Sequence, residues 1–174
     1  TNSLIESLTE IDCDDWTIDE EESKILLVEN TDNHAVIITG SSEDETRKAG
    51  RVLANYEDYS LTGIELLVTG RSLDGASIES AASCTSSSTD ASCVLSDGLS
   101  LVDYQSPFID SGSYNTQNAF VVGVDSLAHD SLSLIDIALS LVTQSSVSNA
   151  RNKIAYEVSS AKYHDLIYVG NPCD

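Results

Sequence analysis

The fold is decided by residues 35–56, which read AVIITGSSEDETRKAGRVLANY. Four apolar residues in succession, 35–38, are typical of a strand that is covered on both faces. Ser42 and Glu45 form a capping box, and apolar residues then recur at helical spacing. The stretch therefore predicts a buried strand that is followed at once by a helix over about residues 43–56.

The turn between this strand and this helix has the outline of a phosphate-binding site, but its charges argue against one. Glu43, Asp44 and Glu45 occupy the positive end of the helix, where they stabilise it and repel phosphate. Neither a G-x-G-x-x-G pattern nor a Walker pattern occurs in the chain. The sequence therefore argues against nucleotide binding.

Four further apolar runs predict buried strands, and their lack of alternation indicates how the sheet is built. Runs that are apolar at consecutive positions suit a parallel sheet sandwiched between helices. The predicted fold class is therefore α/β, with a mostly parallel sheet covered by helices on both faces and a Ser-rich, partly β insertion. The four runs are Ile25–Val28, Ile64–Val68, Ala119–Val124 and Leu166–Val169.

Three more segments have the spacing of helices. One begins at Ser3, which forms a capping box with Glu6; the others cover residues 128–143 and 147–161. Their expected apolar faces are Leu4, Leu8 and Ile11 in the first helix; Leu132, Ile135, Ala138, Leu139 and Val142 in the second, widened by Leu134, Ile137 and Leu141; and Val147, Ala150, Ile154, Val158 and Ala161 in the third.

Residues 71–118 interrupt this pattern of strands and helices. The stretch is too long for an ordinary connection, and it indicates a solvent-facing, β-rich insertion or a linker. Within it, Asp97 and Gly98 stand between two apolar runs and predict a hairpin. The chain is therefore divided into a half-domain 1–70, the insertion 71–118 and a second half-domain 119–174.

The charge of the chain excludes several partners. Its 174 residues include 8 Lys and Arg against 29 Asp and Glu, a formal net charge of −21. Nucleic acids and anionic membranes are bound by clustered cations, so this charge argues against both. No run of 18 apolar residues occurs, and membrane insertion is not expected. So large a charge suits a saline or calcium-containing exterior, or simply an acid-rich surface.

The four cysteines, Cys13, Cys84, Cys93 and Cys173, match neither a zinc site nor a C-x-x-C redox motif. Disulfides are predicted instead, and with them an oxidising compartment outside the cytoplasm. Cys84 and Cys93 enclose a Ser- and Thr-rich tract that a local disulfide would tie down. O-linked sugar is compatible with this composition.

The sequence argues against catalysis. The G-x-S-x-G elbow of serine hydrolases is absent, and oxidised cysteines cannot act as nucleophiles. Among the histidines, His129 with Asp130 is the most suggestive pair. It stands where a helix begins, however, and suits a helix cap or a surface histidine better. We expect no enzyme activity.

Two acidic runs, 12–15 and 19–22, supply the oxygen ligands that calcium prefers. Their spacing does not match an EF-hand, so the sequence predicts weak calcium bridging and no other cofactor. A solvated acidic loop is the competing interpretation. The candidate metal ligands are Asp12, Asp14, Asp15 and Asp19.

Three parts of the chain resemble a known family. Residues 35–70 resemble the C-terminal module of archaeal surface-layer (S-layer) proteins, in which a strand ending in Gly precedes an acidic cap, a Thr-Arg-x-Ala helix and a Leu-x-Gly turn. Residues 120–130 with 135–138 resemble the opening module, and 166–173 the glycine-proline turn. The resemblance implies a lattice-forming cell-surface protein without catalytic residues. The matching positions in the first part are Thr46, Arg47, Ala49, Leu53 to Tyr56, Leu61 and Gly63.

The S-layer modules stand in swapped order in this chain. Joining residue 174 to residue 1 would restore the family's order and bring Cys173 within about 14 residues of Cys13, which implies a second disulfide, within or between chains. Three explanations remain open: a circular permutation, a repeat cut from a tandem array, and a subunit completed by its neighbour's complementary half. The last would produce a head-to-tail polymer.

We therefore expect an extracellular structural subunit that assembles with copies of itself, head to tail, into a cell-surface lattice or filament. The alternative is a surface-anchored adhesion or ligand-binding module. Assembly distinguishes the two, because a lattice or fibre supports the first and a monomer with a lined pocket supports the second.

Overall fold

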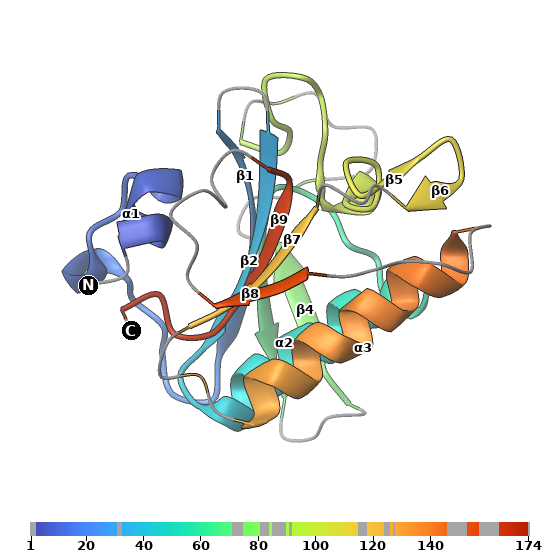
Figure 1. Ribbon diagram of the computed structural model, residues 1–174. Helices are drawn as coiled ribbons and strands as arrows, with labels where there is room; N and C mark the ends of the chain where they lie inside the picture. Colours follow the sequence, from blue (N-terminus) through green and yellow to red (C-terminus); the bar gives the residue numbers. More distant parts are fainter. Residues whose placement is uncertain are drawn as a thin grey trace.

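The computed structural model describes residues 3–30, 33–70, 75–80, 84, 90, 92–114, 118–123, 126, 128–145, 153–156 and 164–173, whose elements are drawn in Figure 1. The strands are β1 (Ser23–Asn30), β2 (Asn33–Gly40), β3 (Glu65–Thr69), β4 (Ser77–Ser80), β5 (Ile109–Asp110), β6 (Ser113–Tyr114), β7 (Ala119–Val122), β8 (Lys153–Tyr156) and β9 (Leu166–Val169). The helices are α1 (Ser3–Thr9), α2 (Glu43–Ala54) and α3 (Ala128–Gln144), with the 3-10 turns η1 (Cys13–Asp15), η2 (Tyr56–Asp58) and η3 (Leu101–Asp103).

The five apolar runs form strands β1, β2, β3, β7 and β9, as predicted. In the described part of the chain they lie in a seven-stranded sheet of order β4-β3-β1-β2-β9-β7-β8, and β5 and β6 form a separate hairpin. The three pairings on the β9 side of β2 are parallel, and the three on the β1 side are antiparallel.

The expectation of a mostly parallel sheet is therefore wrong, because half of these pairings are antiparallel. The reason lies in the connection between the first two strands. Only two residues separate Asn30 from Asn33, and such a link cannot hold the crossover helix that a parallel pair requires. Strands β1 and β2 consequently form a hairpin.

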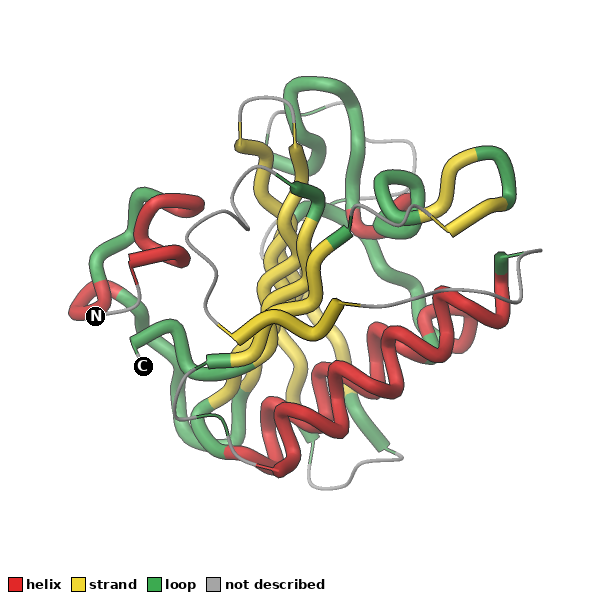
Figure 2. The backbone as a smooth tube through the Cα atoms, in the orientation of Figure 1, coloured by secondary structure: helices red, strands yellow, loops and turns green. Residues whose placement is uncertain are grey.

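The expectation of helices on both faces is also corrected. Helices α2 and α3 lie together on one face, whereas α1, a helix of seven residues, lies on the other (Figures 1 and 2). Leu4, Ile5 and Leu8 of α1 pack with Ile37 of β2, and Trp16 adds to this second cluster. The full helical layer thus covers a single face of the described sheet.

The burial of the strands follows from these two layers. Strands β2, β7 and β9 contribute side chains to the clusters on both faces, which explains their uninterrupted apolar runs. Strand β3 contributes Leu66 and Val68 to the α2 side, and its residues alternate between buried and half-buried. Alternation is the pattern expected of a strand with one covered face.

Helix α2 confirms the strongest helix prediction. The Ser42 hydroxyl accepts a hydrogen bond from the Glu45 N–H at 3.4 Å, so the helix begins at the expected cap. A Cβ on Gly40 would lie 2.4 Å from the Thr46 nitrogen, so glycine is required where the strand turns into the helix. The helix ends at Ala54, slightly before the expected end, because the chain tightens into η2.

The helix predicted over residues 147–161 is wrong where the structure describes it. Residues 153–156 form strand β8, which pairs in parallel with β7 from Lys153 opposite Ala119 to Tyr156 opposite Val122. The edge of β7 offers unpaired backbone groups, and pairing with them overrides the helical spacing of the sequence. The rest of the predicted helix lies outside the described residues.

The insertion 71–118 contributes to the core, contrary to the expectation that it faces solvent. Leu101, Tyr104 and Phe108 are buried in the cluster beneath α2 and α3. The Tyr104 hydroxyl donates to the Leu53 carbonyl at 3.1 Å, and burial raises the pKa of Tyr104 to about 12. The insertion is therefore anchored to α2.

The hairpin predicted at Asp97 and Gly98 is a tight turn without flanking strands. The Leu95 N–H donates to the Leu99 carbonyl at 2.8 Å, and the Gly98 N–H donates to the Leu95 carbonyl at 2.9 Å. Leu95 and Leu99 pack against the main core. The described strands of the insertion are β4, at the edge of the main sheet, and the hairpin β5–β6.

Both predicted half-domains contribute to the same sheet. Strand β2 of the first pairs with β9 of the second, from Ala35 opposite Leu166 to Ile38 opposite Val169. Because this pairing lies within one chain, no neighbour is needed to complete the described sheet. Self-assembly would therefore have to use another surface.

The two long helices approach each other closely at Gly50. A Cβ at this position would lie 2.5 Å from the Ser133 Cβ, which is closer than side chains can approach. Two small residues thus allow α2 and α3 to pack side by side.

We predict that Gly50→Ala lowers the free energy of unfolding by about 1–2 kcal/mol, because overpacking outweighs the gain of about 1 kcal/mol in helix propensity. Ser133→Gly removes the opposing Cβ and should recover part of the loss in the double variant. Urea denaturation followed by circular dichroism measures both effects. An alanine variant as stable as the wild type would contradict the tight contact.

Candidate functional site

Helix α3 packs through the side chains that the sequence predicted would only widen its apolar face. Leu134, Ile137 and Leu141 are buried against the core, and Ser133 is buried beside Gly50 of α2. The apolar pattern runs round most of this helix, so it does not determine which side faces inward. The small side chain of Ser133 fits the close approach of α2 and selects the buried side.

Three residues of the main expected face, Leu132, Ile135 and Leu139, are instead exposed, and we name them the outer row. Their exposed fractions are 43%, 43% and 57%, and Val102 in η3 is the one other large hydrophobic side chain exposed in the described residues. Positions i, i+3 and i+7 align along one side of a helix. Single exposed apolar residues are normal, whereas such a row indicates a contact surface.

Helix α3 is the most apolar of the three helices, yet its length and composition do not suit a membrane span. Among the described helices, none is long and apolar enough to cross a lipid bilayer.

A groove between α2 and α3 borders the outer row at Leu139. Its volume is about 570 Å³; Arg47 and Arg51 of α2 line one side, and Asp136 and Leu139 of α3 line the other. The Arg47 Nη2 lies 2.9 Å from the Asp136 Oδ2, so an ion pair joins the two helices beside the groove. An apolar row and a pair of arginines thus adjoin on one surface.

The structure pairs Cys13 with Cys173 and Cys84 with Cys93, with an S–S distance of 1.98 Å in each. These are the pairs that the sequence analysis proposed, and both bonds lie within the chain. The first bond ties η1 to the residues after β9, so segments from opposite ends of the chain lie together (Figure 1). Two disulfides are consistent with an oxidising compartment.

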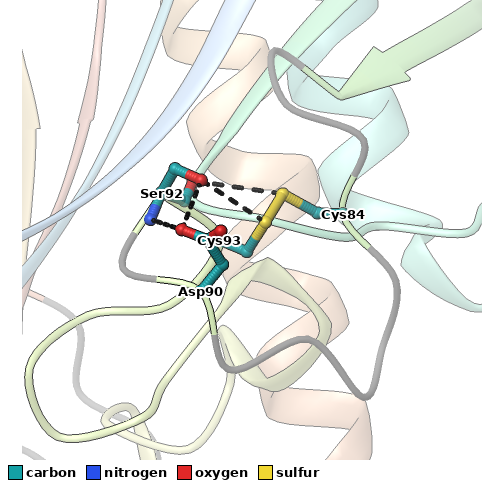
Figure 3. The surroundings of a disulfide bond; sticks show 4 residues. All are labelled: Cys84, Asp90, Ser92 and Cys93. Carbon is teal, nitrogen blue, oxygen red and sulfur yellow. Dashed lines mark hydrogen bonds between the residues drawn. A yellow bond between two sulfur atoms is a disulfide. The ribbon is translucent and has the colours of Figure 1, made fainter.

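Polar contacts surround the disulfide between Cys84 and Cys93 (Figure 3). The Asp90 carboxylate accepts hydrogen bonds from the Ser92 N–H at 3.0 Å and from the Ser92 hydroxyl at 2.9 Å. These bonds hold the pKa of Asp90 below its ordinary value, and the bond from the backbone N–H has the larger effect. The contacts tie Asp90 to the residue that directly precedes Cys93.

The proposed calcium ligands are not gathered into a metal centre. Asp12, Asp15 and Asp19 are exposed, and the side chain of Asp14 lies outside the described part. In the portions of the chain that the structure places, no three His, Cys, Asp or Glu side chains are grouped so that they could hold a metal ion.

His129 contacts acidic residues at the start of α2. Its Nδ1 lies 3.2 Å from an Asp44 oxygen and 3.7 Å from a Glu43 oxygen. The hydroxyl of Ser133 donates to the His129 carbonyl, so the imidazole does not activate this serine. His129 therefore lies between the beginnings of α2 and α3.

A second histidine cluster, which no sequence pattern predicted, joins three distant segments. The His34 Nε2 lies 2.8 Å from an Asp97 oxygen, and its Nδ1 lies 3.3 Å from an Asp165 oxygen. The His34 N–H also donates to Asp165 at 2.8 Å. Nearby, the Ser96 hydroxyl donates to Glu29 at 2.6 Å and holds the same turn. The cluster fastens the turn of the insertion to strands β2 and β9.

This cluster does not have the geometry of a catalytic triad. Both ring nitrogens of His34 face carboxylates, so neither is left to take a proton from a nucleophile. One sequence signal was available, because His34 and Asp165 each stand directly before an apolar run. Only the parallel register of β2 and β9, which sets Ala35 opposite Leu166, makes them neighbours.

Comparison with protein-family models, with curated proteins and with solved structures found no match to this chain.

We predict that Asp97→Asn lowers the free energy of unfolding at neutral pH. As the pH falls, the variant should lose less of this free energy than the wild type does. Burial raises the pKa of Asp97, but hydrogen bonds from Leu99 and His34 outweigh burial and hold it below its ordinary value. At pH values above about 4, which is the pKa in the unfolded state, the carboxylate therefore stabilises the folded state. This contribution disappears as the pH falls through the lower pKa of the folded state.

Urea midpoints at several values between about pH 2.5 and pH 7 test this linkage. The difference between the wild type and Asp97→Asn should shrink toward acid pH, and the exposed control Asp15→Asn should follow the wild type. A difference that stays constant over this range would show that the charge of Asp97 contributes nothing.

We predict that the Cys13→Ser/Cys173→Ser variant loses more stability than the Cys84→Ser/Cys93→Ser variant. The first bond spans 160 residues and the second spans 9, and a longer closed loop restricts the unfolded chain more. Loop entropy gives losses of about 5 and about 2.5 kcal/mol. Urea unfolding of the two double variants measures the difference, and equal losses would contradict this account.

Proposed function

We infer that the protein is an extracellular structural subunit that assembles with copies of itself into a cell-surface lattice or filament. The observation that carries this proposal is the outer row of α3. Three of the four large hydrophobic side chains exposed in the described residues lie on this one helix. Burying such a row against another surface is favourable by the hydrophobic effect.

The two disulfides support a structural role. The two intrachain disulfides close the fold at its ends and at its Ser-rich tract. Secreted structural proteins gain from such bonds, because an oxidising exterior keeps them formed. The charge of −21 suits a surface that remains solvated in a saline or calcium-containing medium.

The histidine clusters support a role without catalysis. His34 is held between two carboxylates, and His129 contacts the acidic start of α2. In both clusters the polar groups connect segments of the fold. We therefore propose that these groups act in structure and not in chemistry.

Membership of the S-layer family is part of this proposal, and it rests on the motif in residues 35–70. Thr46, Ala49 and Leu53 of that motif are buried residues of α2 itself. The motif thus describes how α2 packs on a sheet, which is a structural signature.

A ligand-binding module is the second candidate, and the groove between α2 and α3 favours it. Arg47 and Arg51 line this groove, and paired arginines suit a carboxylate or phosphate ligand. Assembly in purified material separates the candidates, because a binding module does not require it.

We predict that Ile135→Asp/Leu139→Asp weakens self-association at least about 30-fold, since each buried side chain contributes roughly 1 kcal/mol or more. Sedimentation velocity over a concentration series and negative-stain images measure assembly. Val102→Asp is the matched control, because Val102 is similarly exposed but lies in η3. A wild-type protein that stays monomeric with and without calcium would overturn the proposed function.

A further inference from the structure

We propose that the outer row of α3 pairs with the outer row of a second copy of this chain, so that two copies form a dimer with two-fold symmetry. This pairing rests on the proposed self-assembly and names the surface that both copies use. Three features of the described residues support it: the spacing of the row, the charge of its surroundings, and the place of the other exposed hydrophobic side chain.

The outer row has the spacing of a helix that packs against another helix. Ala128 and Val142 extend it at either end, and the steps along these five positions are four, three, four and three residues. Ala128 is exposed and Val142 is half-buried, so the apolar stripe runs along most of α3. An alternation of four and three is typical of the contact between two coiled helices, in which the side chains of one insert between those of the other. The row is therefore suited to pack against a helix of the same pattern.

The surface of α3 carries little free charge, although the chain has a formal net charge of −21. His129 and Asp136 are the partly exposed titratable residues of this helix, and each lies beside opposite charges of α2. Copies of an acidic chain repel one another except where charged groups are absent or paired. Two copies therefore approach through this surface at a low electrostatic cost. The exposed positions of α3 are Ala128, Leu132, Ile135, Leu139, Thr143 and Gln144.

The surface of a second copy determines what can cover the row. An apolar row gains free energy when another apolar surface removes it from water. Among the described residues, the large hydrophobic side chains that are exposed are those of the row and of Val102, a single residue in η3. Within that part of the chain, a second copy thus offers one apolar surface of matching extent, and this surface is its own outer row.

A contact between identical surfaces is isologous, because a two-fold axis relates the two copies and repeats every interaction. Each copy contributes the three large side chains of its row. The contact closes once two copies have met. A lattice or filament would then be built from dimers, through a second contact on another surface.

Opposite charges placed on the rows of different copies test this pairing in the full chain. Ile135→Lys/Leu139→Lys and Ile135→Glu/Leu139→Glu should each dimerise at least about 100-fold more weakly than the wild type, because like charges then face each other. An equimolar mixture of the two variants should return to within about tenfold of the wild type, because opposite charges meet when row faces row.

Sedimentation velocity over a concentration series in EDTA measures dimerisation. Native mass spectrometry verifies that the dimers in the mixture contain one copy of each variant. Thermal unfolding of each variant alone verifies that the fold is kept, which is expected because both positions are exposed.

The matched controls carry the same number of charges away from α3. Val102→Lys/Ser77→Lys and Val102→Glu/Ser77→Glu alter exposed positions of η3 and β4. If net charge alone governs dimerisation, the control mixture behaves like the mixture of row variants, and the inference fails. If the rows pair, each control alone dimerises to within about threefold of the wild type.

The response to salt provides an independent check. Dimerisation of the wild type should strengthen between about 0.1 M and about 0.5 M NaCl, because salt screens the repulsion between the acidic copies and leaves an apolar contact in place. A wild-type dimer that salt weakens would be held by ion pairs, and this result would contradict the apolar pairing.

The outcomes separate this inference from the proposed function. If the wild type forms a lattice or filament that Ile135→Asp/Leu139→Asp weakens, but the mixed variants do not dimerise, the row contacts a different surface of its neighbour. The inference then fails and the proposed function stands. If the wild type forms dimers and nothing larger, with and without calcium, the inference stands and the proposed function fails. A wild type that stays monomeric overturns both.

Discussion

The parallel pairing of β2 with β9 is the constraint on which the rest of the structure depends. It joins the antiparallel strands of the N-terminal part to the parallel strands of the C-terminal part, so one sheet includes both. The same register sets His34 beside Asp165, where the turn of the insertion is fastened. The disulfide between Cys13 and Cys173 then holds the segments at the two ends of the chain together. The described sheet and this disulfide are therefore both completed within one chain.

The layer of α2 and α3 determines what that outer surface contains. Gly50 and Ser133 bring the two helices close together, and this contact turns one apolar side of α3 toward the core. A helix that is apolar round most of its circumference must then leave its other side exposed, which produces the outer row. The groove and its arginines lie at the junction of the same two helices. The proposed assembly surface is therefore a consequence of how α2 and α3 pack.

Several polar side chains of the described residues join one segment of the fold to another. Asp97 and Asp165 hold His34 from two directions, Asp90 orders the turn before Cys93, and Tyr104 ties the insertion to α2. An acidic protein can keep such contacts because its remaining carboxylates are solvated at the surface.

Local sequence was sufficient to predict the five central strands, the cap and helix of α2, and α1, because each depends on neighbouring residues and on burial alone. It did not determine strand direction. Consecutive apolar residues favour a parallel sheet, whereas the two-residue link between Asn30 and Asn33 permits only an antiparallel pair. It assigned 147–161 to a helix, because spacing cannot reveal that the edge of β7 pairs with residues 153–156. The inner side of α3 and the His34 cluster were decided by tertiary structure, since both require residues far apart in the chain to meet. A pattern of apolar residues indicates that a side chain is buried, but only the packing of the whole chain determines which residues it contacts.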